Sequence, residues 1–529
     1  MDLKLLDAEP TDAEREAIDA VVGAASSNGN RVARRDRGQR HLLLPALRAA
    51  QRRVGWVTPG ALGYTSRRLD VPPADAYGVA TFYALLALEE RPAEVLHVCT
   101  DLSCRLAGAE VPEGAIPSPC LGLCERAPAS LRTVAGPEPR EEQIPPASPP
   151  LPQASGLKLL RRIAEGIDPE SQPGFAALER ARELGPERVL ELVQASPLLG
   201  RGGAAFPTGV KWAAVAQQPA QPHYLVCNAD ESEPGTFKDR VLMEQDPFGL
   251  IEAIAIAAYA TGCERAFLYV RAEYPLAHER LQNAIDRSDV GVEIELRIGA
   301  GAYVCGEETA LFQSIEGYRG EPRNKPPFPV EVGLYGKPTV VNNVETLLNV
   351  PHIVLGDDPR DTRLFCVSGH VARPGLYELE LGTPLSGLLE LAGAEPPKAV
   401  LLGGAAGSFL RPDQLELPLS FEGARDAGAT LGSGVVIVYG EEADLVDAVL
   451  RIAEFFRDES CGQCVPCRIG TVRQEEALHR LASGRTQGDE LAVLADLTQV
   501  MRDASICGLG QTAANAVASA MMNLGVLVP

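Results

Sequence analysis

The segments HYLVCNA, residues 223–229, PFGLIEAIAIAAYATG, residues 247–262, and RAFLYVR, residues 265–271, decide the fold of the central part of the chain. The first and third are short apolar runs of the kind that forms buried strands. The second is longer and has a helical pattern. Alternation of such strands and helices is typical of an α/β domain. We therefore expect one α/β domain over residues 156–350.

The sequence pattern divides the rest of the chain, on either side of this domain, into five further parts. Apolar residues at three- and four-residue spacing predict helices near both ends, and a run rich in proline and acidic residues predicts a semi-rigid linker. The expected parts are a helical bundle (1–90), a strand and loop carrying four cysteines (91–135), the linker (136–155), a small α+β domain (351–440) and a closing helical bundle with four further cysteines (441–529).

Composition restricts the class of protein. The chain has 529 residues, 45% of them hydrophobic, so it can bury several separate cores. It contains no apolar run long enough to span a membrane, and its first residues lack the pattern of a signal peptide. A formal net charge of −22 would repel phosphate backbones and anionic lipids. We expect a cytoplasmic protein without nucleic acid as a partner and without direct membrane contact.

The strongest chemical signal is CGQCVPC, residues 461–467, with Cys507 following in SICGLG. The two-residue gaps let Cys461, Cys464 and Cys467 converge on one cubane, and the distant Cys507 closes the site as in [4Fe–4S] proteins. Zinc is the competing interpretation. Because zinc sites usually combine two pairs of ligands, the spacing favours the cluster.

A second group of cysteines lies near the front of the chain. Cys99 and Cys104 form one pair, and Cys120 and Cys124 form another. Two such pairs can each hold one iron of a [2Fe–2S] cluster, or together hold a tetrahedral zinc ion. The spacing alone does not decide between them.

Two Gly-rich segments could bind a phosphate or a sugar. GRGGAAFPTGVKW, residues 200–212, permits close backbone approach and supplies Arg201 and Lys211, although such loops are often only tight turns. The acidic segment NADESEPGTFKDR, residues 228–240, follows it. GAGAYVCGEETALFQSIEG, residues 299–317, places two glutamates where a helix would begin.

Seven segments of the chain together resemble the flavin-bearing, NADH-oxidising subunit of respiratory complex I and of related NAD-dependent formate dehydrogenases and hydrogenases. They occur in the family order: GRGGAAFPTGVKW, CNADESEPGTFKDR, GAYVCGEETAL, PRNKPPFP, TVVNNVETL, ESCGQCVPCRIGT and SICGLGQTA. The front of the chain, with VPPADAYGVATFYALL, CTDLSC and CLGLCERAP, is similar to the family's thioredoxin-like [2Fe–2S] subunit.

The resemblance implies a fold for each part. It implies a thioredoxin-like [2Fe–2S] domain, truncated because the stretch between Cys104 and Cys120 is short, a Rossmann-like FMN domain, a small β-grasp-like domain and a C-terminal helical bundle with [4Fe–4S]. The fold class is therefore multidomain α/β and α+β. The front cysteines are assigned to [2Fe–2S] on the same ground.

The resemblance also implies the site residues. FMN would be held non-covalently by Gly200, Arg201, Gly202, Gly203, Lys211, Asn228, Asp230, Glu231, Tyr303, Gly306, Glu307, Asn342, Asn343 and Thr346. NADH would contact Phe206, Glu233, Glu308, Lys325 and Phe328. No general base is expected, because hydride passes between stacked nicotinamide and flavin rings, with Glu233 nearby.

The function expected from the resemblance is transfer of hydride between NAD(H) and FMN, followed by single-electron transfer through [4Fe–4S] to partner subunits with further iron–sulfur clusters. The fusion of two usually separate subunits, and the lack of further C-terminal cysteines, favour a soluble formate dehydrogenase with a molybdenum or tungsten catalytic subunit. The alternatives are complex I (NADH-quinone oxidoreductase), an NAD-linked or electron-bifurcating hydrogenase, and a non-catalytic zinc scaffold.

Overall fold

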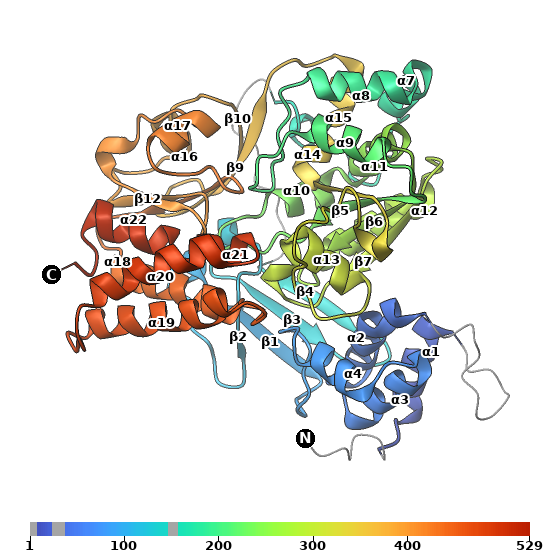
Figure 1. Ribbon diagram of the computed structural model, residues 1–529, viewed down its shortest axis with the longest axis horizontal. Helices are drawn as coiled ribbons and strands as arrows, with labels where there is room; N and C mark the ends of the chain where they lie inside the picture. The colour runs from blue at the N-terminus through green and yellow to red at the C-terminus, as the bar shows by residue number, and fades with distance from the viewer. Residues whose placement is uncertain (1–7, 24–37, 146–156, 529) are drawn as a thin grey trace.

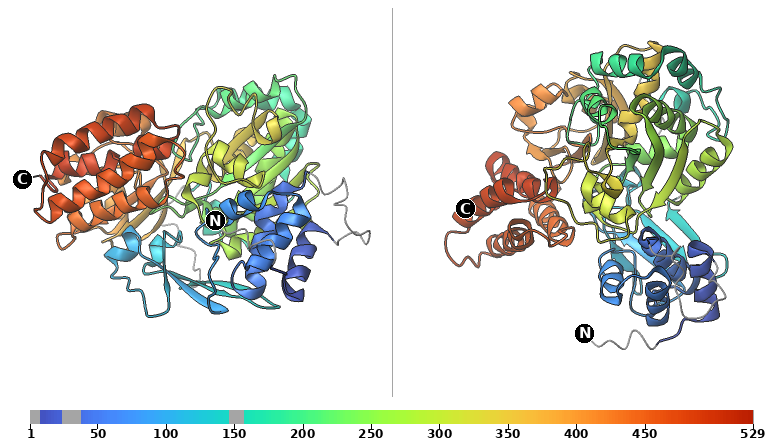
Figure 2. Two further views of the ribbon diagram at one scale, coloured as in Figure 1. Left: turned by 60° about the horizontal axis from the view of Figure 1, so that its bottom comes forward. Right: turned by 45° about the vertical axis from the view of Figure 1, so that its right-hand side comes forward.

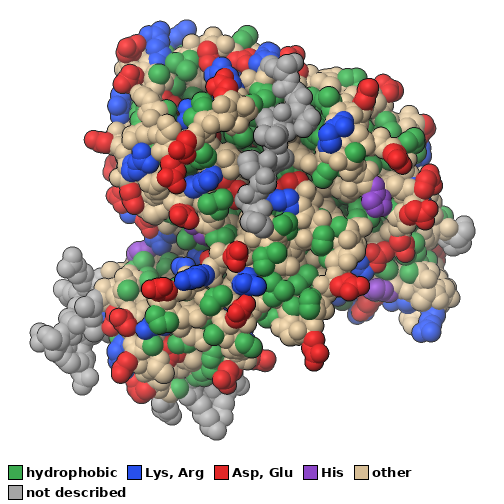
Figure 3. All heavy atoms as spheres, turned by 180° about the vertical axis from the view of Figure 1, so that it is seen from behind, with side chains coloured by type: hydrophobic (Ala, Val, Ile, Leu, Met, Phe, Trp, Pro, Cys, Tyr) green, Lys and Arg blue, Asp and Glu red, His purple; other side chains and the backbone are tan. Residues whose placement is uncertain are grey.

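The computed structural model of the protein describes residues 8–23, 38–145 and 157–528. The N-terminal helices and the C-terminal helices lie on opposite sides of the molecule, and strands of the front domain lie between them (Figures 1 and 2). Within the described residues, no helix is both long and apolar enough to cross a membrane. On the back face, acidic and basic side chains are interspersed rather than gathered into one basic field (Figure 3).

The strand–helix–strand unit predicted at the centre of the chain is confirmed as β5 (His223–Ala229), α11 (Pro247–Thr261) and β6 (Cys263–Val270). Helix α11 begins where the Asp246 side chain accepts a hydrogen bond from Gly249 N, and it ends at Gly262 with a φ of 68°. Thirteen of its 15 residues are buried, which explains why its sequence is apolar on every side.

Strands β7 (Glu293–Ile298) and β8 (Thr339–Asn343) complete a parallel sheet of order β7-β6-β5-β8. β5 thus pairs with β6 on one side and β8 on the other, and in such sheets ligands bind at the carboxyl ends of the strands where the order reverses. The other helices of this domain are α6 (Arg161–Ala164), α7 (Ala176–Leu184), α8 (Pro186–Ala195), α9 (Thr208–Ala216), α10 (Lys238–Gln245), α12 (Pro275–Arg287), α13 (Glu308–Ile315), α14 (Val344–Leu348) and α15 (Val350–Leu355), with 3-10 turns η4 (Tyr303–Gly306) and η5 (Leu334–Gly336).

The front domain is a four-stranded sheet of order β2-β1-β3-β4. Its elements are β1 (Glu94–Cys99), α5 (Leu102–Leu106), β2 (Ile116–Ser118), η3 (Cys124–Arg126), β3 (Ser130–Val134) and β4 (Arg140–Ile144). Strand β4 is a correction to the expected linker, because residues 140–144 pair antiparallel with β3 instead of spanning two domains. Their sequence, REEQI, lacks apolar alternation since only Gln143 is buried. The expected linker residues 146–155 lie outside the described part of the chain.

The predicted N-terminal helices pack against the α/β domain rather than standing apart. They are α1 (Asp12–Val22), η2 (Arg40–Leu42), α2 (Leu43–Val54), α3 (Pro59–Leu69) and α4 (Pro73–Ala80). Their core is continuous with Phe267 and Phe312 of the α/β domain. Tyr83 donates a hydrogen bond to Ser314 Oγ at 2.8 Å across this contact.

The small α+β domain has a mixed sheet of order β10-β9-β13-β11-β12. Its elements are β9 (Thr362–Gly369), β10 (Gly375–Glu380), α16 (Leu385–Ala392), β11 (Ala399–Leu402), β12 (Ser408–Leu410), η6 (Pro412–Gln414), α17 (Phe421–Asp426) and β13 (Val435–Tyr439). β9 and β13 are parallel, and the remaining pairs are antiparallel.

The C-terminal helices form the bundle coloured red in Figure 1. They are α18 (Leu445–Asp458), α19 (Val465–Ala482), α20 (Glu490–Ala504), α21 (Gly508–Thr512) and α22 (Asn515–Leu524). Their apolar faces share one core with β11, β12 and β13, so the bundle is fixed against the small α+β domain.

Candidate functional site

The four front cysteines come together, all buried. Cys99 ends β1, Cys104 lies in α5, Cys120 precedes a short loop, and Cys124 begins η3, which packs against β9. The Cys120 and Cys124 sulfurs lie 3.4 Å apart. Hydrogen bonds from Cys124 and then Cys99 lower the pKa of the Cys120 thiol. The donor set is thus two pairs of neighbouring thiols, which fits a [2Fe–2S] cluster.

The front cysteine loop is held against the α/β domain by buried side chains. Arg240 Nε donates to Gly122 O at 2.9 Å, and Arg271 Nη2 donates to Cys120 O at 2.6 Å. Gly122 has a φ of 66°, and a Cβ atom added there would lie 2.1 Å from the Tyr274 hydroxyl. Only glycine therefore fits this close approach.

The rear cysteines also converge. Cys461 follows α18, Cys464 and Cys467 stand at the start of α19, and Cys507 precedes α21. All four line one small cavity with apolar walls that include Val304 and Leu509. Burial raises the pKa of Cys467 to about 12 and that of Cys507 to about 11. Such thiols become thiolates when a metal centre takes them as ligands, and four in an apolar cavity fit a [4Fe–4S] cluster.

A cavity of about 460 Å³ lies at the carboxyl ends of β5 and β8. Its walls come from the Gly-rich loop, the acidic loop after β5, η4, the small α+β domain near Gly403 and Gly432, and the C-terminal bundle near Leu509. Val304 and Leu509 line both this cavity and the cavity of the rear cysteines. The two sites therefore share a wall.

Most residues expected to hold FMN line this cavity: Gly202, Gly203, Asn228, Asp230, Glu231, Tyr303, Gly306, Glu307 and Asn343. The chemistry of the walls fits a polyhydroxylated phosphate ligand. The buried atoms Asp230 Oδ2 and Ser433 Oγ have no hydrogen-bond partner among the described residues. Gly203 has a φ of 115°, which lets the backbone of the loop face the cavity.

The other five residues expected to hold FMN stand behind the cavity wall. The Arg201 guanidinium is fully buried, pairs with Asp361 and donates to Thr362 O at 3.2 Å. Arg201 N donates to Thr346 Oγ1 at 2.8 Å. Gly200 N donates to Phe206 O at 2.9 Å, which closes the turn of the loop.

Asn342 and Lys211 belong to the same supporting layer. Asn342 Oδ1 accepts from Trp212 Nε1 at 2.7 Å, and Lys211 Nζ donates to Val341 O at 3.1 Å. These contacts anchor α9 on β8. The expected FMN residues therefore form two layers, one facing the cavity and one supporting it.

The cavity is rich in carboxyl groups. Burial raises the pKa of Asp230 to about 8, that of Glu231 to about 7 and that of Glu233 to about 6. Glu233 accepts from the Tyr303 hydroxyl at 2.7 Å and from Ala406 N at 2.8 Å. It therefore ties the α/β domain to the small α+β domain across the cavity.

Lys238 lines the cavity although the sequence alone did not single it out. Its ammonium is buried and lies 2.7 Å from Asp239 and 3.1 Å from Glu345. Burial alone would lower the pKa of Lys238, but Asp239, Glu345 and Glu231 together raise it above its ordinary value. Its place in the acidic segment, residues 228–240, was a usable signal. The walls near Gly403, Thr430 and Asn515 carried no such signal.

The residues expected to contact NADH form a more exposed rim. Phe206 is 49% exposed and Phe328 is 52% exposed, which is unusual for large apolar rings. Lys325 Nζ lies 2.8 Å from both Glu307 and Glu308. Glu307 also lines the cavity, so the rim adjoins it.

Two contacts connect this rim to helix α9. Lys211 Nζ lies 3.7 Å from a Glu308 oxygen and 5.8 Å from the centre of the Phe206 ring. The structure therefore brings Phe206, Glu308 and Lys325 together. Glu233 lines the cavity, as Glu307 does, and its hydrogen bonds come from Tyr303 and Ala406 instead of from the rim.

Comparison with known families agrees with this geometry. Residues 193–352 match the Nuo51 FMN-binding domain, and residues 447–525 match the NADH-ubiquinone oxidoreductase-F iron-sulfur binding region. Residues 30–113 match the thioredoxin-like [2Fe-2S] ferredoxin, and residues 364–405 match the SLBB domain.

Individual relatives agree as well. The chain is 43% identical over 381 residues to an NADH-quinone oxidoreductase subunit of Rhizobium meliloti, covering 66% of this chain and 90% of the relative. It is 40% identical over 399 residues to the NADP-reducing hydrogenase subunit HndC of Solidesulfovibrio fructosivorans, covering 69% and 81%. A chain of the air-oxidized NAD+-reducing [NiFe]-hydrogenase matches with a TM-score of 0.81 and 33% identity, covering 92% of each chain.

Proposed function

Because the chain belongs to the oxidoreductase family of these NADH-quinone oxidoreductase and NADP-reducing hydrogenase subunits, we propose that it is the electron-entry module of a larger redox complex. It is an NADH-oxidising subunit with FMN, [4Fe–4S] and [2Fe–2S] as cofactors and NAD(H) as substrate. The observation that carries the proposed electron path is the shared wall: Val304 and Leu509 line both the large cavity and the cavity of the rear thiols.

FMN is proposed to occupy the 460 Å³ cavity. When bound, it supplies the chemistry that accepts a hydride and releases single electrons. The unpaired Asp230 Oδ2 and Ser433 Oγ suit its hydroxyl groups, and the glycines of the loop at residues 200–203 let backbone amides approach its phosphate. Arg201, Asn342 and Thr346 are proposed to keep this loop in place rather than to touch the cofactor.

NADH is proposed to bind on the exposed rim beside the cavity. The Phe206 and Phe328 rings offer stacking faces, and Lys325 offers a cation. Glu307 is the structural link, since it lines the cavity and lies 2.8 Å from Lys325. A nucleotide on the rim would therefore reach the cavity with its reacting end.

The partner enzyme is proposed to be the molybdenum or tungsten subunit of a soluble NAD-dependent formate dehydrogenase. The support is the presence of a [2Fe–2S] domain and the flavin module in one chain. A hydrogenase is the second candidate. It is favoured by the 92% mutual coverage with a chain of the NAD+-reducing [NiFe]-hydrogenase.

The native complex, purified through a tag on this chain, separates these candidates. NAD+ reduction is followed at a fixed protein concentration with formate or with hydrogen as the donor. NAD+ reduction with formate but not with hydrogen supports the formate dehydrogenase. NAD+ reduction with hydrogen but not with formate supports the hydrogenase. NADH oxidation by ferricyanide, measured on the same sample, tests the module itself, and its absence would contradict the function proposed for this chain.

A further inference from the structure

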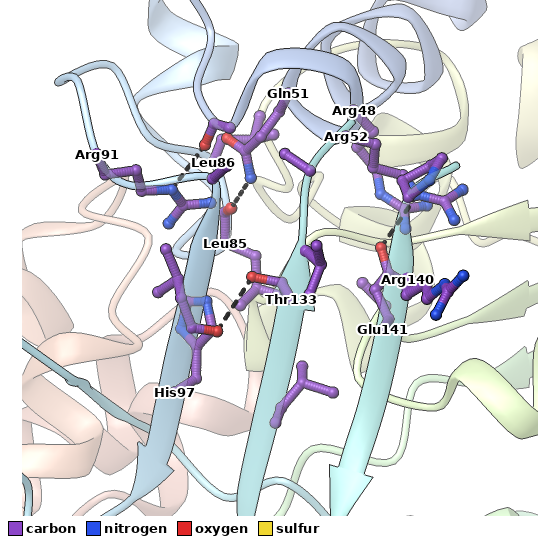
Figure 4. A pocket seen from close by; sticks show the side chains of 18 of the residues that line it. Arg48, Gln51, Arg52, Leu85, Leu86, Arg91, His97, Thr133, Arg140 and Glu141 are labelled. Atoms are coloured by element: carbon purple, nitrogen blue, oxygen red, sulfur yellow. Dashed lines mark hydrogen bonds and ion pairs between the residues drawn. The ribbon is translucent and has the colours of Figure 1, made fainter. Parts of the chain in front are cut away.

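We propose that a second cavity, lined by none of the proposed cofactor residues, binds a small phosphate-type oxyanion. It lies between helix α2 and strands β1, β3 and β4 of the front domain, and its volume is about 60 Å³ (Figure 4). We call it the arginine cavity, after Arg48, Arg52, Arg91 and Arg140 in its walls. None of the residues that line it belongs to the sets proposed for FMN, NADH or the two clusters.

The charge of the arginine cavity is opposite to that of the protein. Four guanidinium groups line it against one carboxylate, Glu141, although the whole chain has a formal net charge of −22. Glu141 is already committed, because its Oε1 lies 3.1 Å from Arg52 Nε. Arg140 is largely exposed and lies 3.9 Å from Glu138, so Arg48 and Arg91 are the cavity's two guanidiniums without a carboxylate within 4 Å in the described part of the chain. Two such cations repel each other unless an anion joins them.

Arg48 is the cation that most needs such an anion. Within the described part of the chain its guanidinium makes no hydrogen bond or ion pair, and Figure 4 shows it beside Arg52 at the cavity. Burial has the largest effect on the pKa of Arg48 and lowers it; Glu141 and Glu273 raise it and Arg52 lowers it, without restoring the ordinary value. A partly buried guanidinium without an acceptor is costly, and a bidentate oxyanion would satisfy it.

The walls of the arginine cavity are fixed by hydrogen bonds to backbone groups, so the cavity does not depend on an anion to form. Gln51 Nε2 donates to Leu85 O at 2.5 Å and Gln51 Oε1 accepts from Ala87 N at 2.7 Å, which holds the loop before β1 against α2. Arg91 Nε donates to Gly55 O at 2.7 Å, which leaves its terminal nitrogens for a ligand. The site is preorganised for an anion with several acceptor oxygens.

Phosphate-type anions suit these walls better than a single carboxylate would. Guanidinium groups pair with phosphate oxygens in a planar, bidentate geometry, and a tetrahedral anion can meet guanidiniums that approach from different elements. Arg48 comes from α2, Arg91 from the loop before β1, and Arg140 from β4. The source can be free inorganic phosphate or the phosphoryl group of a small metabolite.

The test is calorimetric titration of the full, cofactor-loaded chain with inorganic phosphate and, separately, with glycerol 3-phosphate at constant ionic strength. Arg48→Gln should weaken phosphate binding by about tenfold. Arg53→Gln is the matched control, because Arg53 lies on the same helix and pairs with Glu16 at 3.7 Å, outside the cavity. It should leave binding unchanged.

Thermal unfolding distinguishes a loss of phosphate binding from misfolding of the variant. Without phosphate, Arg48→Gln should melt no lower than wild type, since it removes an unpaired charge, and it should lose the rise in Tm that phosphate gives. Arg91→Gln, on another wall, should weaken phosphate binding likewise. Response to phosphate but not to glycerol 3-phosphate would assign the site to the free anion. No binding by wild type, or equal losses in Arg48→Gln and Arg53→Gln, would overturn the proposal.

Discussion

Arg271 connects the front cysteine loop to the cavity proposed for FMN: its Nη2 donates to Cys120 O and its Nη1 donates to Glu231 O, both at 2.6 Å. Its guanidinium is buried and also lies 2.7 Å from Glu273. A cation beside a cluster ligand stabilises the more negative, reduced state of the cluster. One side chain thus sets both the position of the loop and the local charge.

Replacing Arg271 by glutamine should lower the reduction potential of the [2Fe–2S] cluster by about 60 mV, the shift of a tenfold change in a one-electron equilibrium. Arg271→Lys keeps the charge and should restore much of the potential. A redox titration followed by electron paramagnetic resonance measures both. Arg265→Gln, on β6 but far more exposed, is the control. Equal potentials in wild type and Arg271→Gln would disprove this role.

Gly122 should be indispensable for the front cluster. An alanine there would need a φ of 66° and would place its Cβ 2.1 Å from the Tyr274 hydroxyl, a strain of about 1–3 kcal/mol before the clash is counted. We expect Gly122→Ala to lose about two irons per chain and to keep FMN.

Gly114→Ala provides the comparison for this prediction. Gly114 also has a positive φ, of 82°, but nothing lies within 4 Å of an added Cβ. It should retain all the iron, as measured by metal analysis. If both alanine variants lose iron alike, the close approach of Tyr274 is not the reason for the glycine.

Phe206 should govern NADH binding rather than the chemical step. Its 49% exposed ring gains a stacking partner only when the nucleotide binds. Phe206→Ala should raise KM for NADH by about fivefold to thirtyfold, with kcat changed little, in NADH:ferricyanide assays. Val210→Ala removes a 54% exposed apolar side chain from the neighbouring helix α9 and should change neither constant. A fall in kcat alone would contradict the stacking role.

Glu231 should make stability depend on pH. Burial and then Asp239 raise its pKa to about 7, from about 4.5 when unfolded. Between pH 4.5 and 7 the folded state holds a proton on Glu231 more tightly than the unfolded state does. The contribution of protonated Glu231 to the free energy of unfolding is therefore fully present below pH 4.5 and is lost as pH rises through 7. Glu231→Gln removes it.

The measurement is the melting temperature of both proteins from pH 5 to pH 8. The excess in Tm of wild type over Glu231→Gln should shrink as pH rises. Converted to free energy of unfolding, this difference should change by at most about 1.4 kcal/mol per pH unit for one proton. Glu264→Gln, an exposed position on β6, should show a constant difference from wild type. An advantage that grows with pH would reverse the sign and refute the assignment.

The central fold was predictable because local pattern and burial agree there. Strand β5 and helix α11 lie where their apolar runs predict, since both are buried on nearly all sides. Strand β4 was missed because it is held by pairing with β3 and by Gln143, which donates to Glu273 O at 2.9 Å, and not by an apolar face. Contacts of this kind leave no periodic signal in the sequence.

The parts of the candidate site that lie within one sequence segment were predictable. The parts that depend on contacts between distant segments were not. The eight clustered cysteines and the loops at residues 200–212 and 228–240 carried their own signals. Arg201 was expected at the cofactor, but its ion pair with Asp361 turns the guanidinium away from the cavity. That partner lies 160 residues along the chain, and no local pattern indicates it.

The most direct test that electrons enter through this chain is an anaerobic titration of the purified protein with NADH, followed by optical absorbance and electron paramagnetic resonance after iron and FMN analysis. We predict about six irons and one FMN per chain, bleaching of the flavin absorbance by NADH, and a signal from a reduced cluster. A chain that holds FMN and iron but is not reduced by NADH would contradict the claim that electrons enter here.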